Sequence, residues 1–155
     1  MNNKIKWVGK YEIVVKKDGE VVKTEVIKNR VMNGALNALA NAFLDTDPDL
    51  DINYLAVGTS SAALADNQTG LTTEVFRTAP SVVPTLTGTG EVATEFIILD
   101  SEAQVAIEEL GIFAGSTCTT AANTGTLLSR VLWSYDKTVT NIEIAVRRTD
   151  TLDRG

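Results

Sequence analysis

The sequence predicts a mainly β protein with one long helix: an antiparallel β-sandwich with an N-terminal hairpin and a helix packed on the sheet. Three observations lead to this fold class. An Asp-Gly dipeptide separates two alternating segments near the N-terminus, one stretch has a helical period, and short alternating segments follow from residue 52 onward. The length of 155 residues fits one domain, and a charged fraction of 22% is typical of folded rather than disordered chains.

Residues 11–27 are predicted to form the hairpin. Asp18-Gly19 is a strong signal for a two-residue turn, because type I′ turns need positive φ at both central positions. Counting outward from this turn predicts three pairs on one apolar face: Tyr11 with Val26, Ile13 with Thr24, and Val15 with Val22. The opposite face is then charged and carries Glu12, Lys16, Lys23 and Glu25.

Residues 30–44 have the period of a helix. Their apolar positions are Met32, Leu36, Leu39 and Phe43, and alanines between them raise the helix propensity. Asn29 is the predicted N-cap, and Pro48 lies shortly beyond the predicted end. We expect this to be the only long helix, with its apolar stripe covering one face of a sheet.

Six further segments read as short strands, within residues 54–58, 72–83, 91–99, 104–113, 126–134 and 139–147. Pro80 interrupts the second of them, and a phase slip near Glu108-Glu109 predicts a bulge in the fourth. A turn is expected at 135–137. The predicted domain spans 1–155, with a basic hairpin segment at 1–30, a helix and sandwich core at 31–147, and a C-terminal tail at 148–155.

Charge is unevenly distributed along the chain. Residues 1–30 hold eight basic and four acidic side chains, whereas residues 31–129 hold Arg77 against twelve acidic ones. The acidic middle argues against nucleic-acid binding, which depends on neutralising phosphates with Lys and Arg. Opposite charges on two parts of the chain can instead help copies of it dock on one another, although a solvated surface explains the same pattern.

The composition excludes several kinds of chemistry. Histidine is absent and Cys118 is the single cysteine, which removes intramolecular disulfides, Cys–His zinc sites and catalysis that uses an imidazole base. Phosphate-binding loops, dinucleotide fingerprints and nucleophile elbows are missing from the sequence. Glu108 and Glu109 would point to opposite faces of a regular strand. A bulge could bring them nearer, but no electrophile or second polar cluster accompanies them in the sequence. We therefore expect no enzyme activity and no cofactor.

One acidic run resembles the opening of a calcium loop, with carboxylates at Asp45, Asp47, Asp49 and Asp51. Pro48 interrupts the run, and Ala56 stands where such a loop needs a bidentate Glu. We interpret it as a solvated acidic loop and keep its four carboxylates as candidate metal ligands. No apolar run approaches the roughly 20 residues of a membrane span, and residues 1–9 do not resemble a signal peptide.

Five aromatic side chains could form a platform for stacking on sugars: Trp7, Tyr54, Phe76, Trp133 and Tyr135. Trp133 is in phase with Val131 on a predicted strand, so a place in the core is the favoured interpretation. Trp7 belongs to the basic N-terminal segment, together with Lys4 and Lys6. These three residues are candidates for a subunit contact.

Four short motifs follow one another along the chain. They are Ala56-Val57-Gly58-Thr59, then Glu74-Val75-Phe76-Arg77, then Glu109-Leu110-Gly111-Ile112-Phe113, then Gly125-Thr126-Leu127-Leu128-Ser129-Arg130. In this order they resemble short bacteriophage tail-fibre and baseplate-associated structural proteins, over about residues 25–147. Ser60-Ser61 replaces the glycine-rich dipeptide that commonly follows the first motif.

The resemblance implies a virion structural protein of the tail that forms a homo-oligomer and binds other phage structural proteins. It supplies no catalytic residues. Because neither a signal peptide nor a membrane span is recognised, we expect assembly in the host cytoplasm. Glu109 could form a buried or interfacial ion pair with Arg77 or Arg130, so these three are added to the interface candidates. Two alternatives stay open: a capsid decoration or head-fibre protein, and a carbohydrate-binding adhesin module that binds a host-surface glycan.

Overall fold

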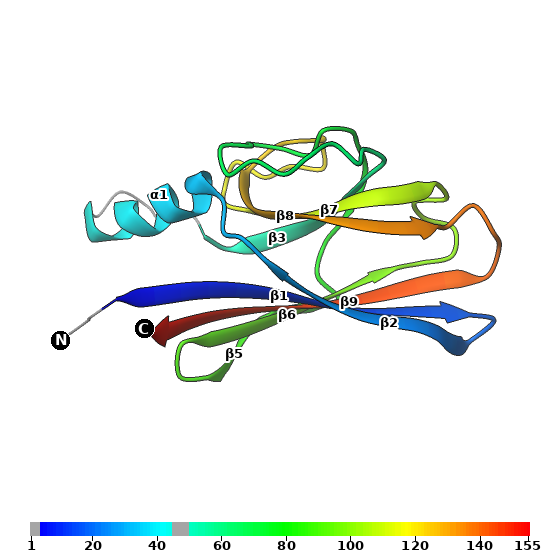
Figure 1. The fold of residues 1–155 in the computed structure, drawn as a ribbon, viewed down its shortest axis with the longest axis horizontal. Coiled ribbons are helices and arrows are strands. Elements are labelled where there is room, and N and C mark those ends of the chain that lie inside the picture. The colour runs from blue at the N-terminus through cyan, green and yellow to red at the C-terminus, as the bar shows by residue number, and fades with distance from the viewer. Residues whose placement is uncertain (1–3, 45–49) are drawn as a thin grey trace.

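The computed structural model describes residues 4–44 and 50–155, in which nine strands form two antiparallel sheets (Figure 1). The five-stranded sheet has the order β2-β1-β9-β6-β5, and its strands are β1 Ile5–Lys17, β2 Glu20–Asn29, β5 Val82–Gly88, β6 Glu91–Ile98 and β9 Ile142–Arg154. The four-stranded sheet has the order β4-β3-β7-β8, and its strands are β3 Ile52–Gly58, β4 Glu74–Thr78, β7 Ala106–Ala114 and β8 Thr126–Asp136. The predicted mainly β architecture is confirmed.

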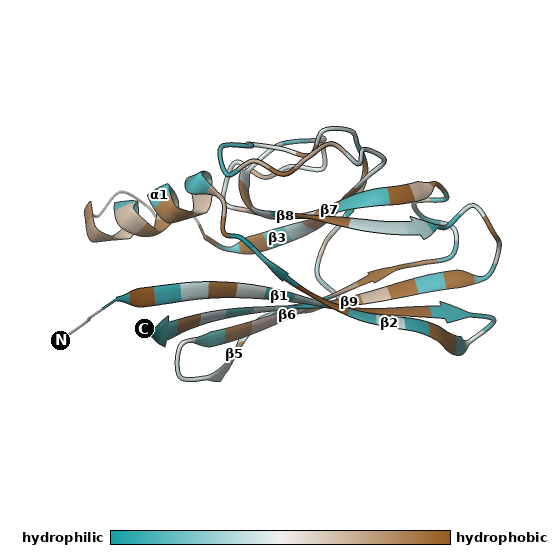
Figure 2. Ribbon diagram, viewed as in Figure 1, coloured by the Kyte–Doolittle hydropathy of each residue, from teal (hydrophilic) through white to brown (hydrophobic). Residues whose placement is uncertain are grey.

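The two sheets share one apolar core. The five-stranded sheet contributes Tyr11, Ile13, Val15, Phe96, Ile98, Ile144 and Val146 to it, and the four-stranded sheet contributes Leu55, Val57, Leu110, Ile112, Val131 and Trp133. These residues follow the two-residue period of strands, which places every second side chain on the same face. The alternation is visible along β1 and β9 as brown bands between paler or teal ones (Figure 2).

The predicted hairpin turn is confirmed. Asp18 and Gly19 both have positive φ, 51° and 82°, as a type I′ turn requires. The predicted pairing is wrong by one residue, because Tyr11 pairs with Ile27 and Ile13 pairs with Glu25. A β-bulge beside the turn, between Val15 and Lys16, causes the shift.

This shift moves the side chains of β2 to the opposite faces. Val22 and Val26 were expected in the core but are 54% and 59% exposed. Lys23 and Glu25 instead lie on the inner side, where the Trp133 indole N–H donates a 2.9 Å hydrogen bond to the Glu25 carboxylate. A slip of one residue reverses every side chain of a strand, so one bulge is enough to explain all of these differences.

The helix is shorter than predicted. It consists of α1, Asn33–Asn41, followed by a 3-10 turn, η1, Ala42–Leu44. Asn29 is the last residue of β2 and not the N-cap, because α1 begins at Asn33 and its N-cap is Met32. The expected apolar stripe packs on the sheets only in part: Met32 and Ala35 are buried, but Leu36 is 48% and Phe43 84% exposed.

The remaining strands lie close to their predicted places, with two changes at their ends. Residues 72–83 divide into β4 and β5 on either side of Pro80. The pairing of β7 with β8 is irregular at Glu108, as expected, but the extra residue lies in β8 and not in β7, because Ile107 pairs with Tyr135 and Glu109 pairs with Leu132. The turn expected at 135–137 is wrong, since β8 continues to Asp136. Residues 148–154 are not a tail but the second half of β9, which pairs with β1 as far as Arg154.

Tyr11 connects the two sheets through a polar contact inside the core. Its hydroxyl lies 2.5 Å from the Ser129 hydroxyl of β8, and the Arg148 guanidinium lies 4.8 Å from the centre of its ring. Burial raises the pKa of the Tyr11 hydroxyl above 10.0, and the positive charge of Arg148 opposes part of this rise. The folded protein therefore favours the protonated hydroxyl.

We expect Tyr11→Phe to lower the free energy of unfolding at pH 7 by about 1–2 kcal/mol, because Ser129 loses its buried partner. The raised pKa makes protonated Tyr11 stabilising below pH 10 and removes that contribution as the pH rises through the folded-state value. The variant should therefore lose less stability than the wild type above pH 10. Urea denaturation at pH 7 and at a pH above 10 tests this, with a Tyr135→Phe variant at a half-buried position as control. Equal losses in the two variants would contradict the bridging role.

Candidate functional site

All four motifs of the resemblance lie in the four-stranded sheet. They occupy β3, β4, β7 and β8 in that order. Two long connections start from these strands, residues 59–73 between β3 and β4 and residues 115–125 between β7 and β8. Both cover the side of this sheet that faces away from the other sheet (Figure 1). We call them the two outer loops.

A buried ion pair lies beneath the first outer loop. Arg130 Nε is 2.5 Å from Glu109 Oε2, and both side chains are 0% exposed. Of the two partners considered for Glu109, the structure selects Arg130. The expected buried pair is thus present, and it lies within one chain.

Both members of this pair also bind the backbone of the loop. Glu109 accepts hydrogen bonds from the N–H groups of Thr72 and Thr73, at 3.1 and 2.8 Å. The Arg130 guanidinium donates to acceptors earlier in the loop, which are the carbonyls of Ser60, Ala62 and Ala63 and the side-chain oxygen of Gln68. The pair therefore satisfies its charges with loop groups as well as with each other.

A second buried ion pair anchors the other outer loop. Arg77 Nε is 2.6 Å from Glu74 Oε1, and the side chains are 4% and 1% exposed. Arg77 donates to the carbonyls of Thr119 and Thr124, at 2.9 and 3.2 Å, and Glu74 accepts from the backbone N–H of Asn123 at 2.6 Å. The guanidinium also lies 4.6 Å from the centre of the Phe113 ring, a cation–π contact.

A small apolar layer fills the space under the loops. It contains Met32, Ala56, Leu71, Phe113 and Leu127, with Tyr54 and Cys118 packed against it. On the surface, the loops enclose an open polar hollow of about 450 Å³ lined by Asn67, Gln68, Thr69, Gly70, Leu71 and Asn123. Such amide and hydroxyl groups can bind an uncharged polar ligand through hydrogen bonds.

The interface candidates fall into two groups. Arg77, Glu109 and Arg130 are buried inside the chain and are not part of its outer surface. Lys4 and Lys6 are exposed at the beginning of β1. Trp7 is half-buried nearby, and its indole N–H donates a 2.9 Å hydrogen bond to Asp150.

Sequence reasoning missed the ion pair to which Trp7 is linked. Arg148 binds Asp150 through two hydrogen bonds of 2.6 and 3.0 Å, and it also donates to the side-chain oxygen of Asn29. Arg148 is fully buried, and it occupies the space that a side chain at Gly9 would need. The period-2 pattern of β9 offered the only sequence signal, because Arg148 and Asp150 continue the buried series of Ile144 and Val146.

Lys137 was likewise missed, having been assigned to a turn. It is buried, and its ammonium donates to the carbonyls of Leu99, Asp100 and Glu102 at 2.7, 3.0 and 2.6 Å. Burial lowers its pKa, and the nearby carboxylates of Asp100 and Glu102 oppose this. The contact fixes the connection between β6 and β7 and is structural.

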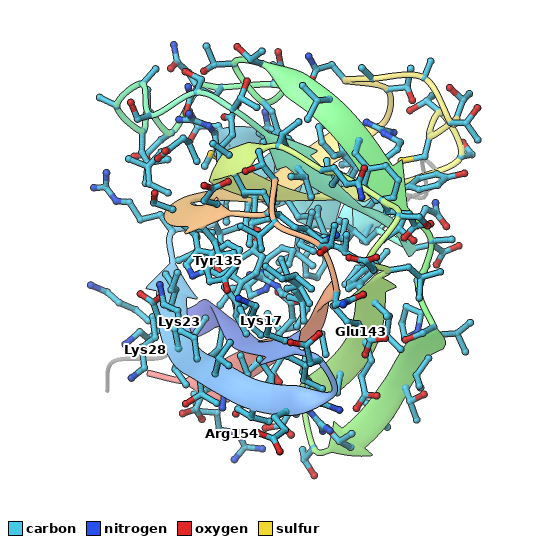
Figure 3. The ribbon with its side chains drawn as sticks, turned by 90° about the vertical axis from the view of Figure 1, so that its right-hand side faces the viewer. Lys17, Lys23, Lys28, Tyr135, Glu143 and Arg154 are labelled. Atoms are coloured by element: carbon cyan, nitrogen blue, oxygen red, sulfur yellow. The ribbon has the colours of Figure 1, made fainter. Side chains whose placement is uncertain are left out.

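The five aromatic side chains do not gather on one exposed face. Trp133 is buried in the core, as predicted, and stacks on Tyr135 with ring centres 5.6 Å apart. The Lys23 ammonium lies 5.6 Å from the centre of the Trp133 ring and 5.8 Å from that of the Tyr135 ring. Figure 3 shows Lys23 and Tyr135 as neighbours. Trp7, Tyr54 and Phe76 are half-buried elsewhere.

The candidate metal ligands Asp45, Asp47 and Asp49 lie outside the described residues, and Asp51 is exposed. Within residues 4–44 and 50–155, no three His, Cys, Asp or Glu side chains are grouped as a metal site would require. In the same part of the chain, no helix has the length and apolar character needed to cross a membrane.

Comparison of the chain with protein-family models, with curated proteins and with solved structures gave no match.

We expect Glu109→Gln to lower the free energy of unfolding by about 3–5 kcal/mol, because it leaves the buried Arg130 charge uncompensated. Protease cleavage within residues 59–73 should become faster, since this loop loses its anchor. Urea denaturation and limited proteolysis measure the two effects. The matched control is Glu108→Gln, since Glu108 is half-buried and bonds the Ser134 hydroxyl. An unchanged Glu109→Gln variant would refute the anchoring role.

Arg77→Met should loosen the second outer loop, because it leaves the Glu74 carboxylate unpaired beneath it. Cys118 lies in this loop, and its thiol is half-buried. We expect a thiol reagent to modify Cys118 roughly tenfold faster in the variant, since local opening becomes easier. Arg147→Met, which removes an exposed guanidinium near Glu12 and Glu95, is the control and should leave the rate unchanged.

Proposed function

We propose that this protein is a non-enzymatic virion structural protein: a phage tail fibre, fibre adaptor or baseplate component. It acts by forming homo-oligomers and docking on other tail proteins, and its two sheets form an antiparallel β-sandwich. The single observation that carries this proposal is a concentration of exposed apolar side chains at one end of the molecule. Four large apolar side chains are mostly exposed: Phe43 (84%), Ile5 (74%), Leu86 (72%) and Leu44 (69%). So much exposed apolar surface at one end is unusual for a soluble protein that works as a monomer.

The elements that carry these residues lie together. Figure 1 places α1, the beginning of β1, the end of β9 and the β5–β6 hairpin at the same end of the molecule. Soluble monomers rarely expose contiguous apolar patches of large side chains, and such patches are typical of protein–protein contacts. This favours a chain that works in an assembly.

The charged residues of the four motifs support a structural role. Glu74, Arg77, Glu109 and Arg130 form the two ion pairs that anchor the outer loops. Their charges are compensated inside the fold, so none of them is available for acid–base chemistry on a substrate. The resemblance to tail-fibre and baseplate proteins agrees with this role, and it supports other phage structural proteins as partners and the tail as the location.

The polar hollow between the outer loops favours a carbohydrate-binding adhesin as a second candidate. Its amide and hydroxyl groups suit the hydroxyl groups of a host-surface glycan. The absence of an exposed aromatic platform among the described residues weighs against this alternative. A capsid decoration or head-fibre protein would share the same fold features and would bind assembled shells instead of tails.

Light scattering over a range of concentrations and salt tests the proposed self-association. We expect a mass that is an integer multiple of the chain mass and that persists at high salt, because apolar contacts are not screened. A monomer under all conditions would contradict self-association. Mass spectrometry of density-purified phage particles tests the location: peptides of this chain should copurify with tails, and their absence would refute the virion proposal.

A further inference from the structure

The exposed apolar end surrounds a cleft of about 290 Å³ between the two sheets. Apolar side chains from both sheets and from α1 line it, among them Trp7, Leu39, Pro84, Val92, Leu128 and Leu152. The carboxylate of Asp150 also borders the cleft, but it already accepts hydrogen bonds from Trp7 and Arg148. The cleft therefore offers apolar contact and few polar groups to orient a small ligand.

The residues around the cleft indicate a macromolecular occupant. Ile5, Leu86 and Leu44 are among the most exposed large apolar side chains, and they belong to the elements at this end of the molecule. A small ligand inside the cleft would leave them in water. A protein surface laid over this end would cover them together with the cleft, and a fully buried aromatic side chain at its centre would contribute most of the affinity.

The chain itself carries an aromatic side chain suited to this cleft. Phe43 is 84% exposed and follows Leu39, which lines the cleft, by four residues. Residues spaced by four lie on the same side of a helical segment, one turn apart. Phe43 is thus close to the cleft of its own chain but outside it. Figure 2 shows that α1 and η1 are predominantly hydrophobic along their length.

We infer that the cleft of each copy receives Phe43 from a second copy of this chain. This inference rests on the proposed self-association and specifies its surface. The projecting side chain and the cleft belong to the same end of the molecule. Two copies related by a two-fold axis can therefore each insert Phe43 into the cleft of the other, so that every contact occurs twice. The same arrangement covers Leu44, Ile5 and Leu86 of both chains.

Charge around the cleft fits this pairing. Lys4 and Lys6 are exposed at the beginning of β1, and the exposed carboxylate of Asp51 borders the cleft. In a reciprocal dimer the basic residues of one copy face the acidic residue of the other, which favours like copies over an uncharged partner. The candidates Trp7, Lys4 and Lys6 thereby belong to the proposed interface, with Trp7 in the wall of the cleft.

Sedimentation equilibrium of the full chain tests the inference through Phe43→Ser. We expect the dissociation constant of self-association to rise by roughly tenfold or more. The melting temperature at a concentration low enough to keep the chain monomeric should be unchanged, because Phe43 is not part of the core. The matched control is Val26→Ser, which removes an equally apolar side chain that is 59% exposed on β2. The control should associate like the wild type.

Crosslinking between two differently tagged chains locates the contact, in a Cys118→Ser background. A chain with Phe43→Cys should form a disulfide with a chain carrying Leu152→Cys, and not with one carrying Val26→Cys. An oligomer that Phe43→Ser leaves intact, or equal crosslinking to both positions, would overturn the inference and leave the proposed function standing. A wild-type chain that is monomeric at every concentration would overturn both.

Discussion

Glu109 and Arg130 are neighbours on β7 and β8, with side chains fully removed from water. An ion pair in such a place costs considerable desolvation free energy, and the fold tolerates it only if the remaining hydrogen-bonding groups are satisfied. Here the backbone of residues 60–73 supplies them. The course of the first outer loop therefore depends on the pair. The pair also requires a glycine at position 58, because a Cβ on Gly58 would overlap Glu109.

The same arrangement occurs at two further places. Glu74–Arg77 lies beneath the second outer loop, and Arg148–Asp150 lies within β9, where it binds Trp7 of β1 and Asn29 of β2. In each case the planar guanidinium, with five N–H donors, binds a carboxylate and further acceptors at the same time. Two of these pairs connect the outer loops to the four-stranded sheet, and the third connects neighbouring strands of the five-stranded sheet; an apolar contact would position these segments less specifically.

This organisation separates two surfaces with different properties. The side covered by the outer loops is polar, hydrogen-bonded and anchored by buried charges. The end that holds α1, the first residues of β1 and the β5–β6 hairpin is apolar and contains a cleft. The motif residues that suggested an interface belong to the first of these, where they are interior. The proposed interface is formed by residues without a motif, Phe43 among them, so motif order and contact surface are independent properties of this chain.

The sequence by itself determined the features that depend on neighbouring residues. Asp18-Gly19 adopts the predicted turn because positive φ is a local preference, and the strands follow from a two-residue period that each segment carries alone. The phase slip at Glu108 likewise located an irregularity in the strand pairing, although the extra residue lies in the partner strand β8. The place of Trp133 in the core followed from the same period.

Only the tertiary structure decided which distant residues meet. Arg130 rather than Arg77 pairs with Glu109, and Trp7 bonds Asp150, 143 positions away in the sequence. Neither charge nor spacing distinguishes such partners, because Coulomb and hydrogen-bond interactions act through space and not along the chain. The register of the hairpin was also decided by the tertiary structure. One bulge at Val15 and Lys16 exchanges the two faces of β2, and in this register Glu25 accepts the hydrogen bond of the Trp133 indole on the other sheet.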